Sequence, residues 1–403
     1  MNKKGFLASI GGINILLLGL VSFFNDVSSE MILPLLPLFI TTLGGSGVAI
    51  GLIGGLMQGL PEILKVFSGY FSDRIKHRSR FIFGGYFLSQ ISKLSLFFAV
   101  SPINVLFSTS ADKIGKGIRE APRDALISES LPHEKGKAFA IQRVFDKSGA
   151  IIGNLLVLSI VIFFGVSVAR DSLIRSIIFF ASLVGFICLI PIFFLKEGKK
   201  LDGKKEKIGN FKESIKLLPK AFWIFVVLSI IFAFADFSYM FFILKANSFF
   251  NHSTSFILPI IPIILYVIYN AAYTGFAIPF GKLSDRIGRI KVLIMGGIFF
   301  SILCLGFLFA SKFYIFVLLF ILYGLVYAIM ISNQRALVSD LSPGSIRATS
   351  LGIFQTSIGI ASILAGIVAG LLYDINSSYL FAYGLILGLV YVVCMFLFRK
   401  NFD

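Results

Sequence analysis

The chain has 403 residues, of which 57% are hydrophobic and 14% are charged, and its formal net charge is +17. A soluble domain has roughly 45–50% apolar and about 25% charged residues, so this composition argues against an ordinary soluble enzyme. The basic residues lie in short segments between apolar runs and lack the interleaved aromatic residues of a stacking platform, so we expect no nucleic-acid partner.

Apolar runs separated by polar or Gly/Pro breaks predict twelve membrane-spanning helices, because about 20 apolar residues are needed to cross about 30 Å of hydrocarbon. The first run follows Met1-Asn-Lys-Lys, but it is too long for a signal peptide and lacks a small-residue cleavage site, so we expect a retained first helix. In chain order, the predicted helices lie near 13–43, 47–72, 81–100, 103–128, 138–164, 171–195, 218–248, 255–281, 291–310, 313–340, 346–372 and 378–398.

Lysine and arginine residues outside these helices lie almost entirely in the termini and in the even-numbered connections. Because positively charged loops stay on the cytoplasmic side, we predict that both termini are cytoplasmic. The longest polar stretch falls within 196–217 and is the expected cytoplasmic linker, close to anionic lipid headgroups. The predicted domains are therefore one six-helix bundle at 1–195 and another at 218–403.

The chain matches itself at a shift of about 211 residues, as two fused copies of one unit would. In this alignment of the chain with itself, Asp26 in the first predicted helix corresponds to Asp236 in the seventh, and Gly149 corresponds to Gly359. The longest match pairs Gly69-Tyr-Phe-Ser-Asp73-Arg74 with Gly281-Lys-Leu-Ser-Asp285-Arg286. Parallel repeats place a substrate site near the middle of the membrane, between the two copies.

The second copy continues through Gly288 to Arg289 and resembles the loop signature G-x-L-x-D-R-x-G-R-x-K of major facilitator transporters. The resemblance covers essentially the whole chain. It implies an all-α membrane protein with twelve helices in two pseudo-symmetric six-helix bundles, and a monomer that works by alternating access. It also implies that these loops latch the cytoplasmic side shut, through Gly69, Asp73, Arg74, Gly281, Asp285, Arg286 and Arg289.

The fourth predicted helix carries a second resemblance, in the segment from Asp112 to Ile127. It is similar to a motif, G-K-G-I-R-x-A-P-R-D-A-L, of a largely uncharacterised branch of bacterial and archaeal facilitator carriers, which implies a prokaryotic plasma membrane. Lys113 and Gly117 match the Arg and Gly of the wider family's R-x-x-x-G motif, whose Arg is implicated in proton coupling. Lysine differs from arginine because it can lose its proton when buried.

Ionisable residues inside predicted spans are costly in hydrocarbon, so each is a candidate for function. Asp26 and Glu30 lie four residues apart on one helix face, which suits a proton carrier or a cation ligand. Proton-coupling or substrate candidates are Asp26, Glu30, Lys113, Lys116, Arg119 and Asp236. A charge network between helices is expected from Arg123, Asp124, Arg143 and Asp146.

The three cysteines and three histidines are scattered along the chain, so the sequence predicts no disulfide framework, no metal site and no cofactor. No glycine-rich ATP-binding motif is present either. We therefore expect a secondary transporter, with proton-coupled efflux of a small drug-like or organic solute as the first reading. The coupling ion is a proton or another ion. A carrier of metal, metal chelate or anionic solute is the alternative within transport. Outside transport, the alternatives are a membrane receptor or a membrane enzyme.

Overall fold

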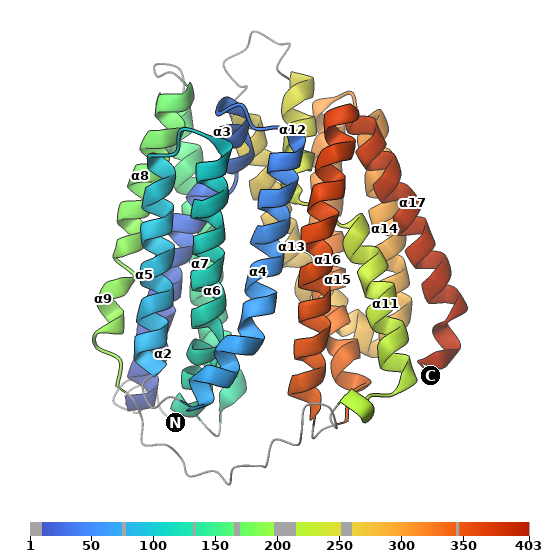
Figure 1. The fold of residues 1–403 in the computed structure, drawn as a ribbon, viewed down its shortest axis with the longest axis horizontal. Helices are drawn as coiled ribbons and strands as arrows, with labels where there is room; N and C mark the ends of the chain where they lie inside the picture. The colour runs from blue at the N-terminus through green and yellow to red at the C-terminus, as the bar shows by residue number, and fades with distance from the viewer. Residues whose placement is uncertain are drawn as a thin grey trace. The chain divides into compact units, whose positions relative to one another are not determined.

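A computed structural model describes residues 10–74, 78–131, 134–164, 170–196, 215–250, 260–343 and 346–402. The side chains of 10, 66, 69–74, 135, 170, 250 and 348 lie outside that description. All regular secondary structure within these ranges is helical (Figure 1). The chain divides into two compact units, of which unit 1 comprises 1–45 and 60–203 and unit 2 comprises 46–59 and 204–403.

Unit 1 consists of long helices and two short ones, α3 and α9. They are α2 (Ile10–Ile32), α3 (Leu36–Thr42), the 60–74 part of α4 (Gly47–Arg74), α5 (Arg78–Phe97), α6 (Pro102–Ser130), α7 (Lys135–Phe164), α8 (Arg170–Phe186) and α9 (Leu189–Ile192). Within it, α5 packs against α6 and α8, and α2 packs against α7.

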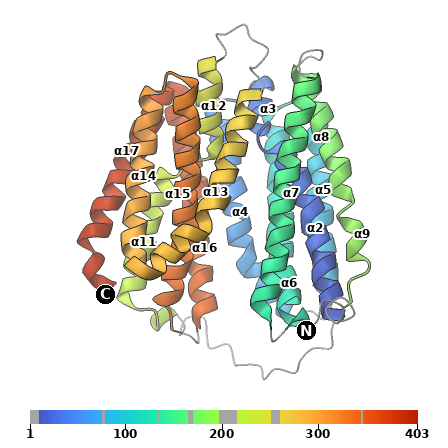
Figure 2. The ribbon, with the colours of Figure 1, turned by 180° about the vertical axis from the view of Figure 1, so that it is seen from behind.

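Unit 2 repeats this plan (Figure 2). Its helices are α11 (Lys220–Ala235), α12 (Tyr239–Phe250), α13 (Ile260–Ile287), α14 (Arg289–Phe309), α15 (Phe313–Asp340), α16 (Arg347–Ile375), α17 (Ser377–Leu397) and the short η2 (Arg399–Asn401). Here α14 packs against α15 and α17, and α11 packs against α16. These pairings correspond in order to those of unit 1 and support the internal repeat seen in the sequence.

Each predicted span contains one helix or a pair of consecutive helices, and local chemistry explains several helix ends. The Ser101 hydroxyl accepts a hydrogen bond from Asn104 N at 3.4 Å, and Pro102 follows it at the first position of α6. Asn376 accepts a bond from Ser378 N at 2.8 Å and so starts α17. Gly288 has a φ of 97°, which allows the tight turn between α13 and α14.

Three predicted helices were wrong in being drawn as continuous. The first breaks between α2 and α3, where Pro34 and Pro37 interrupt the backbone hydrogen bonds. The sixth breaks between α8 and α9, shortly before Pro191. The seventh breaks between α11 and α12 at residues 236–238, a segment without proline. Hydropathy reports how apolar a segment is, and it does not detect such breaks.

Within the described ranges, ten helical stretches are long and apolar enough to cross a membrane. The twelve predicted spans also include α5 and α6, whose mean hydropathy is lower than that of these ten stretches. The reason in α6 is its seven ionisable residues between Asp112 and Asp124. Such a polar helix is stable in a bundle when its charges pair with neighbouring helices, and the contacts described below provide those pairs.

Helix α4 is shared between the two units, since its residues 47–59 belong to unit 2 and the remainder to unit 1. In unit 2, Gly51 packs directly against Gly366 of α16, and a Cβ on Gly51 would lie 1.9 Å from the Gly366 carbonyl oxygen. Gly47 and Gly370 meet in the same way one turn away. Both carboxylate oxygens of Asp374 accept bonds from backbone N–H groups of α4, Oδ1 from Gly47 and Oδ2 from Val48 at 3.0 Å. Small residues thus bring the two backbones into contact.

Candidate functional site

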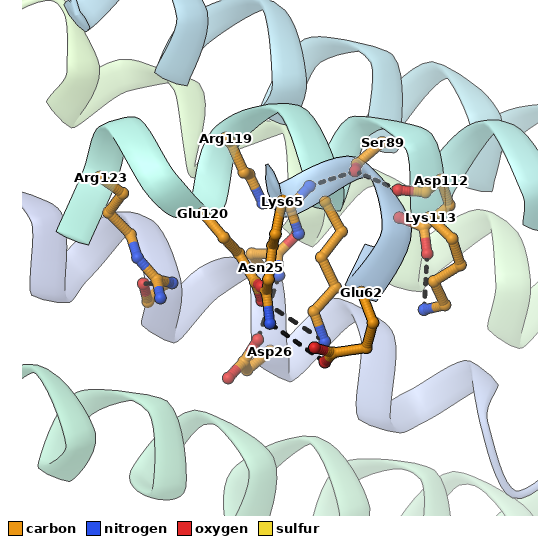
Figure 3. A network of polar contacts seen from close by, with 12 residues as sticks. Asn25, Asp26, Glu62, Lys65, Ser89, Asp112, Lys113, Arg119, Glu120 and Arg123 are labelled. Carbon is orange, nitrogen blue, oxygen red and sulfur yellow. Dashed lines mark hydrogen bonds and ion pairs between the residues drawn. The ribbon is translucent and has the colours of Figure 1, made fainter. Parts of the chain in front are cut away.

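Glycines hold α6 close to its neighbours and so fix where its charged side chains lie. A Cβ on Gly115 would lie 2.5 Å from the Gly85 carbonyl oxygen of α5, and one on Gly117 would lie 2.5 Å from the Leu64 Cβ of α4. The Ser68 hydroxyl of α4 also donates to the Gly117 carbonyl at 2.7 Å. The glycines of the helix-4 motif therefore permit close packing, and its charged residues face α4, α5 and α2 (Figure 3).

A group of ion pairs joins α4 to α6. Lys65 Nζ lies 3.1 Å from Glu62 on its own helix and 2.6 Å from Glu120 on α6. Lys116 lies 3.6 Å from the other oxygen of Glu120, and its side chain is 43% exposed. Lys116 is therefore held at the edge of this group, and the pairing of Glu62 with Lys65 within α4 extends to a second helix.

Arg119 is the most deeply placed of the predicted α6 candidates, with 4% of its surface exposed. Its guanidinium donates to the Ser89 hydroxyl and, at 3.4 Å, to the Gly85 carbonyl. Its Cζ also lies 4.2 Å from the centre of the Tyr86 ring. These contacts all come from α5, and planar stacking of this kind is specific to arginine.

The centre of unit 1 contains a lysine that sequence reasoning missed. Lys93 of α5 is 3% exposed and donates to Asn25 of α2, at 3.3 Å to the carbonyl oxygen and 3.2 Å to Oδ1. Asn25 Oδ1 also accepts a bond from Gln90 at 3.1 Å, and Asn25 Nδ2 donates to Asp26 at 3.1 Å. A continuous chain of hydrogen bonds thus leads from Lys93 to the Asp26 carboxylate.

The same lysine connects to the start of the helix-4 motif. The Asp112 carboxylate acts electrostatically on Lys93 and receives an ion pair from Lys113 at 2.9 Å. Lys113, predicted to take part in coupling, is therefore paired with its chain neighbour. Its charge is balanced within the group that contains Lys93, Asp112 and Asn25.

Beyond Asp26, the polar chain continues to α7. The Asp26 carboxylate lies within electrostatic range of Asp146, which accepts a bond from Gln142 at 3.0 Å. Gln142 also donates to the Ser22 hydroxyl, which accepts a second bond from Arg123 at 3.3 Å.

The predicted charge network comes together in part. Arg123 pairs with Asp124 at 3.0 Å and acts on Asp146, whereas Arg143 is exposed and forms no ion pair or hydrogen bond with the residues that the structure describes. Glu30, predicted to act with Asp26, accepts a bond from Asn154 of α7 at 3.3 Å. The carboxylate that the structure brings near Asp26 is Asp146.

The two loop signatures are described to different extents. The side chains of Gly69, Asp73 and Arg74 lie outside the described part of the chain. In the second copy, Arg289 pairs with Asp285 at 3.2 Å and also binds Asp340 at the end of α15. Arg286 lies in the last turn of α13, and a Cβ on Gly281 would meet nothing within 4 Å. Arg289 thus ties α13, α14 and α15 together at one end of unit 2.

Asp236 lies in unit 2 at the break between α11 and α12, where its own N–H ends α11 by donating to Phe232 O at 2.8 Å. Its side chain is half-buried. No described side chain donates a hydrogen bond or forms an ion pair with its carboxylate. This distinguishes Asp236 from the carboxylates of unit 1 whose side chains the structure describes, since each of those has a partner.

Sequence reasoning missed the neutral partners and Lys93. Gln90 and Lys93 are three residues apart in a segment that contains no other charged residue between 81 and 97, and this spacing on one helix face is the signal that would have indicated them. Asn25, beside Asp26, carries no charge and has no such pattern around it. Its role depends on α2 meeting α5, which a single sequence does not reveal.

Known proteins resemble this chain over nearly its full length. A profile of the Major Facilitator Superfamily matches residues 18–268 and 263–402. An uncharacterized MFS-type transporter of Methanocaldococcus jannaschii is 45% identical over 377 residues, which cover 94% of this chain and 92% of that protein. The multidrug resistance protein MdtH of Shigella dysenteriae is 28% identical over 118 residues, or 29% of either chain.

Solved structures show the same fold. The crystal structure of a mutant of the nucleoside transporter NupG superposes with a TM-score of 0.82 at 18% identity, covering 96% of this chain and all of that one. Together with the profile match, this likeness confirms the predicted all-helical membrane fold of two pseudo-symmetric bundles. The chain is a multi-pass membrane protein that belongs to the Major Facilitator Superfamily, and it is a secondary transporter of a small molecule rather than an enzyme.

Proposed function

We propose that this transporter exports a small organic solute in exchange for protons, and that Asp26 and Asp146 carry the coupling proton. The observation on which this rests is the approach of the two carboxylates on α2 and α7. Two negative charges in a membrane interior repel each other, and binding one proton relieves the repulsion. Proton loading at this pair then changes the electrostatic balance of the whole polar chain.

The hydrogen-bond chain connects that pair to the rest of unit 1. Asp26 connects through Asn25 to Lys93, and Asp146 connects through Gln142 and Ser22 to Arg123. Protonating either carboxylate weakens the hydrogen bonds that it accepts. Because these bonds belong to a chain that includes residues of α2, α5, α6 and α7, one proton affects the contacts among all four helices. A switch between two transport states needs a coupling of this kind between a local charge and several helices.

The remaining parts of the proposal concern direction, location and ancestry. Export is supported by the partial likeness to a multidrug resistance protein. The distribution of basic residues supports cytoplasmic termini in a prokaryotic plasma membrane. The segment from Asp112 to Ile127 supports membership of the branch with the helix-4 motif, and the family resemblance supports a monomer made of bundles 1–195 and 218–403 joined at 196–217.

A reconstituted system tests the coupling. Liposomes loaded with a pH-sensitive dye receive an imposed proton gradient, and pools of cationic, neutral and anionic solutes are added to wild-type protein. We expect solute-dependent proton flux with at least one pool, and its loss in Asp26→Asn and Asp146→Asn. Asp171→Asn, which removes a half-exposed carboxylate paired with Arg175 on α8, is the control outside the polar chain and retains the flux. Solute movement without proton movement contradicts the proposal.

An anionic solute is the second candidate. Two further cations, Lys113 and Arg119, lie within electrostatic range of Lys93 in unit 1, and they share this region with the single carboxylate of Asp112. The anionic pool in the same assay tests this directly. A metal carrier receives no such support, because no three His, Cys, Asp or Glu side chains gather into a metal site within the described ranges.

A further inference from the structure

Six tyrosines of α12, α13 and α15 form a connected cluster in unit 2, here termed the tyrosine cluster. Its members are Tyr239, Tyr266, Tyr269, Tyr273, Tyr323 and Tyr327. Neighbouring ring centroids lie between 4.7 and 6.0 Å apart. The tyrosines of α13 are spaced by three and four residues and those of α15 by four, so each helix presents its tyrosines on one face. The two helices pack together, which joins these faces (Figure 2).

The cluster has a buried layer and an accessible layer. Tyr266, Tyr269 and Tyr323 are at most 8% exposed. Tyr239 and Tyr327 keep part of their surface accessible. An aromatic core that served packing alone would favour phenylalanine, as at Phe242, which stacks on Tyr323 at 4.5 Å behind the cluster. A surface of tyrosine rings supported by a rigid second layer is instead suited to contact a ligand.

Asp236 lies beside this cluster. Its carboxylate is within electrostatic range of Tyr323, Tyr269 and Cys304. In the described part of unit 2, no lysine, arginine or hydrogen-bond donor offsets its charge. A carboxylate at membrane depth costs about 2.5–3.5 kcal/mol on insertion scales, so an uncompensated one indicates a partner that arrives with the ligand.

We propose that Asp236 and the tyrosine cluster form a subsite for the cationic group of an organic amine or quaternary ammonium solute. This names the substrate class of the transporter proposed above and rests on that function. Tyrosine faces attract a cation placed over them, and the nearby carboxylate supplies the opposite charge. A hard metal ion is a poor fit, because it requires six or more oxygen ligands and the subsite has one carboxylate.

Binding to purified full-length protein in detergent tests the subsite without any transport step. The probes are tetramethylammonium, tetraethylammonium and benzyltrimethylammonium, measured by isothermal titration calorimetry. We expect wild type to bind at least one of them, and Asp236→Asn to weaken that binding at least about tenfold because the opposite charge is lost. Neither the uncharged isostere neopentylbenzene nor the anion phenylacetate is expected to displace the bound probe.

Variants of Tyr239 separate the ring from its hydroxyl. Tyr239→Leu removes one cation–π contact and weakens binding roughly threefold to thirtyfold, whereas Tyr239→Phe retains the ring and most of the affinity. Asp171→Asn in unit 1 is the matched carboxylate control and binds as wild type does. Thermal unfolding of each variant verifies that it is folded.

Two results overturn the subsite. One is a wild-type protein that binds none of the ammonium probes, and the other is equal binding by wild type and Asp236→Asn. Either result leaves the proton-coupling proposal standing if the liposome assay shows flux with a neutral or anionic pool. Conversely, cation binding without proton flux retains the subsite and removes the coupling.

Discussion

At the scale of single residues, we expect a substitution of Lys93 to destabilise the protein, because its amine is buried and donates to Asn25. Lys93→Met retains the length and most of the volume of the side chain but removes the donor from Asn25 and the cation near Asp112. We expect a loss of about 1–3 kcal/mol of unfolding free energy, the cost of leaving buried polar groups without partners. Thermal unfolding in detergent measures it.

Lys137→Met is the matched control for that variant. Lys137 pairs with Glu134 at 2.8 Å, and both side chains are more than 40% exposed. Exposed pairs of this kind contribute about 0–1 kcal/mol, so the unfolding temperature of this variant stays close to that of wild type. Equal destabilisation by the two substitutions contradicts the central role given to Lys93.

Candidate residues were predictable from the sequence when they are charged and lie in apolar segments. Asp26 and Asp236 stand out in this way, and the structure places Asp26 at a polar group and Asp236 at a break in a helix. Arg119 was indicated instead by the helix-4 motif. Their partners were not predictable. Asp146 meets Asp26 only because α7 packs on α2, and a contact 120 residues apart leaves no local pattern in one sequence.

At the scale of helices, the contact of α4 with α16 depends on glycine. A Cβ on Gly366 would lie 2.1 Å from the Gly51 carbonyl oxygen, and a backbone atom has no room to move. Gly366→Ala is therefore expected to lower the unfolding free energy by about 1–3 kcal/mol through overpacking. Gly275→Ala in α13 is the control, because a Cβ there meets nothing within 4 Å and alanine favours the helix by up to about 1 kcal/mol. In thermal unfolding, we expect Gly366→Ala to lower the unfolding temperature and Gly275→Ala to raise it.

The positions of the helices followed from hydropathy, but their interruptions did not, although proline marks one of them in the sequence. Pro34 and Pro37 indicate the break after α2, although the predicted span ran through both. The break at Asp236 has no such mark. An aspartate inside an apolar segment reads as a buried charge, and whether the backbone unwinds around it depends on tertiary contacts that propensity does not include.

At the scale of the whole molecule, the division of α4 predicts how the two parts of the chain associate. Residues 46–59 precede the linker in sequence, yet they pack within unit 2 against α16. We expect that cutting the chain at a protease site inserted between 196 and 217 leaves two fragments that purify together in detergent, because the first fragment supplies part of the second unit's packing. Affinity purification through a tag on the carboxyl terminus measures their association.

Two fragments could also purify together simply because one detergent micelle encloses both. A variant at the contact between Gly51 and Gly366 separates this explanation from specific packing. Gly366→Leu places a large side chain where Gly51 now meets α16, so residues 46–59 lose their site in unit 2. After cleavage, the amino-terminal fragment of this variant is expected in the unbound fraction, while the cut Gly275→Leu protein still yields both fragments. Co-purification that survives Gly366→Leu would show that other surfaces hold the fragments together, and the glycine contact would then be unnecessary for their association.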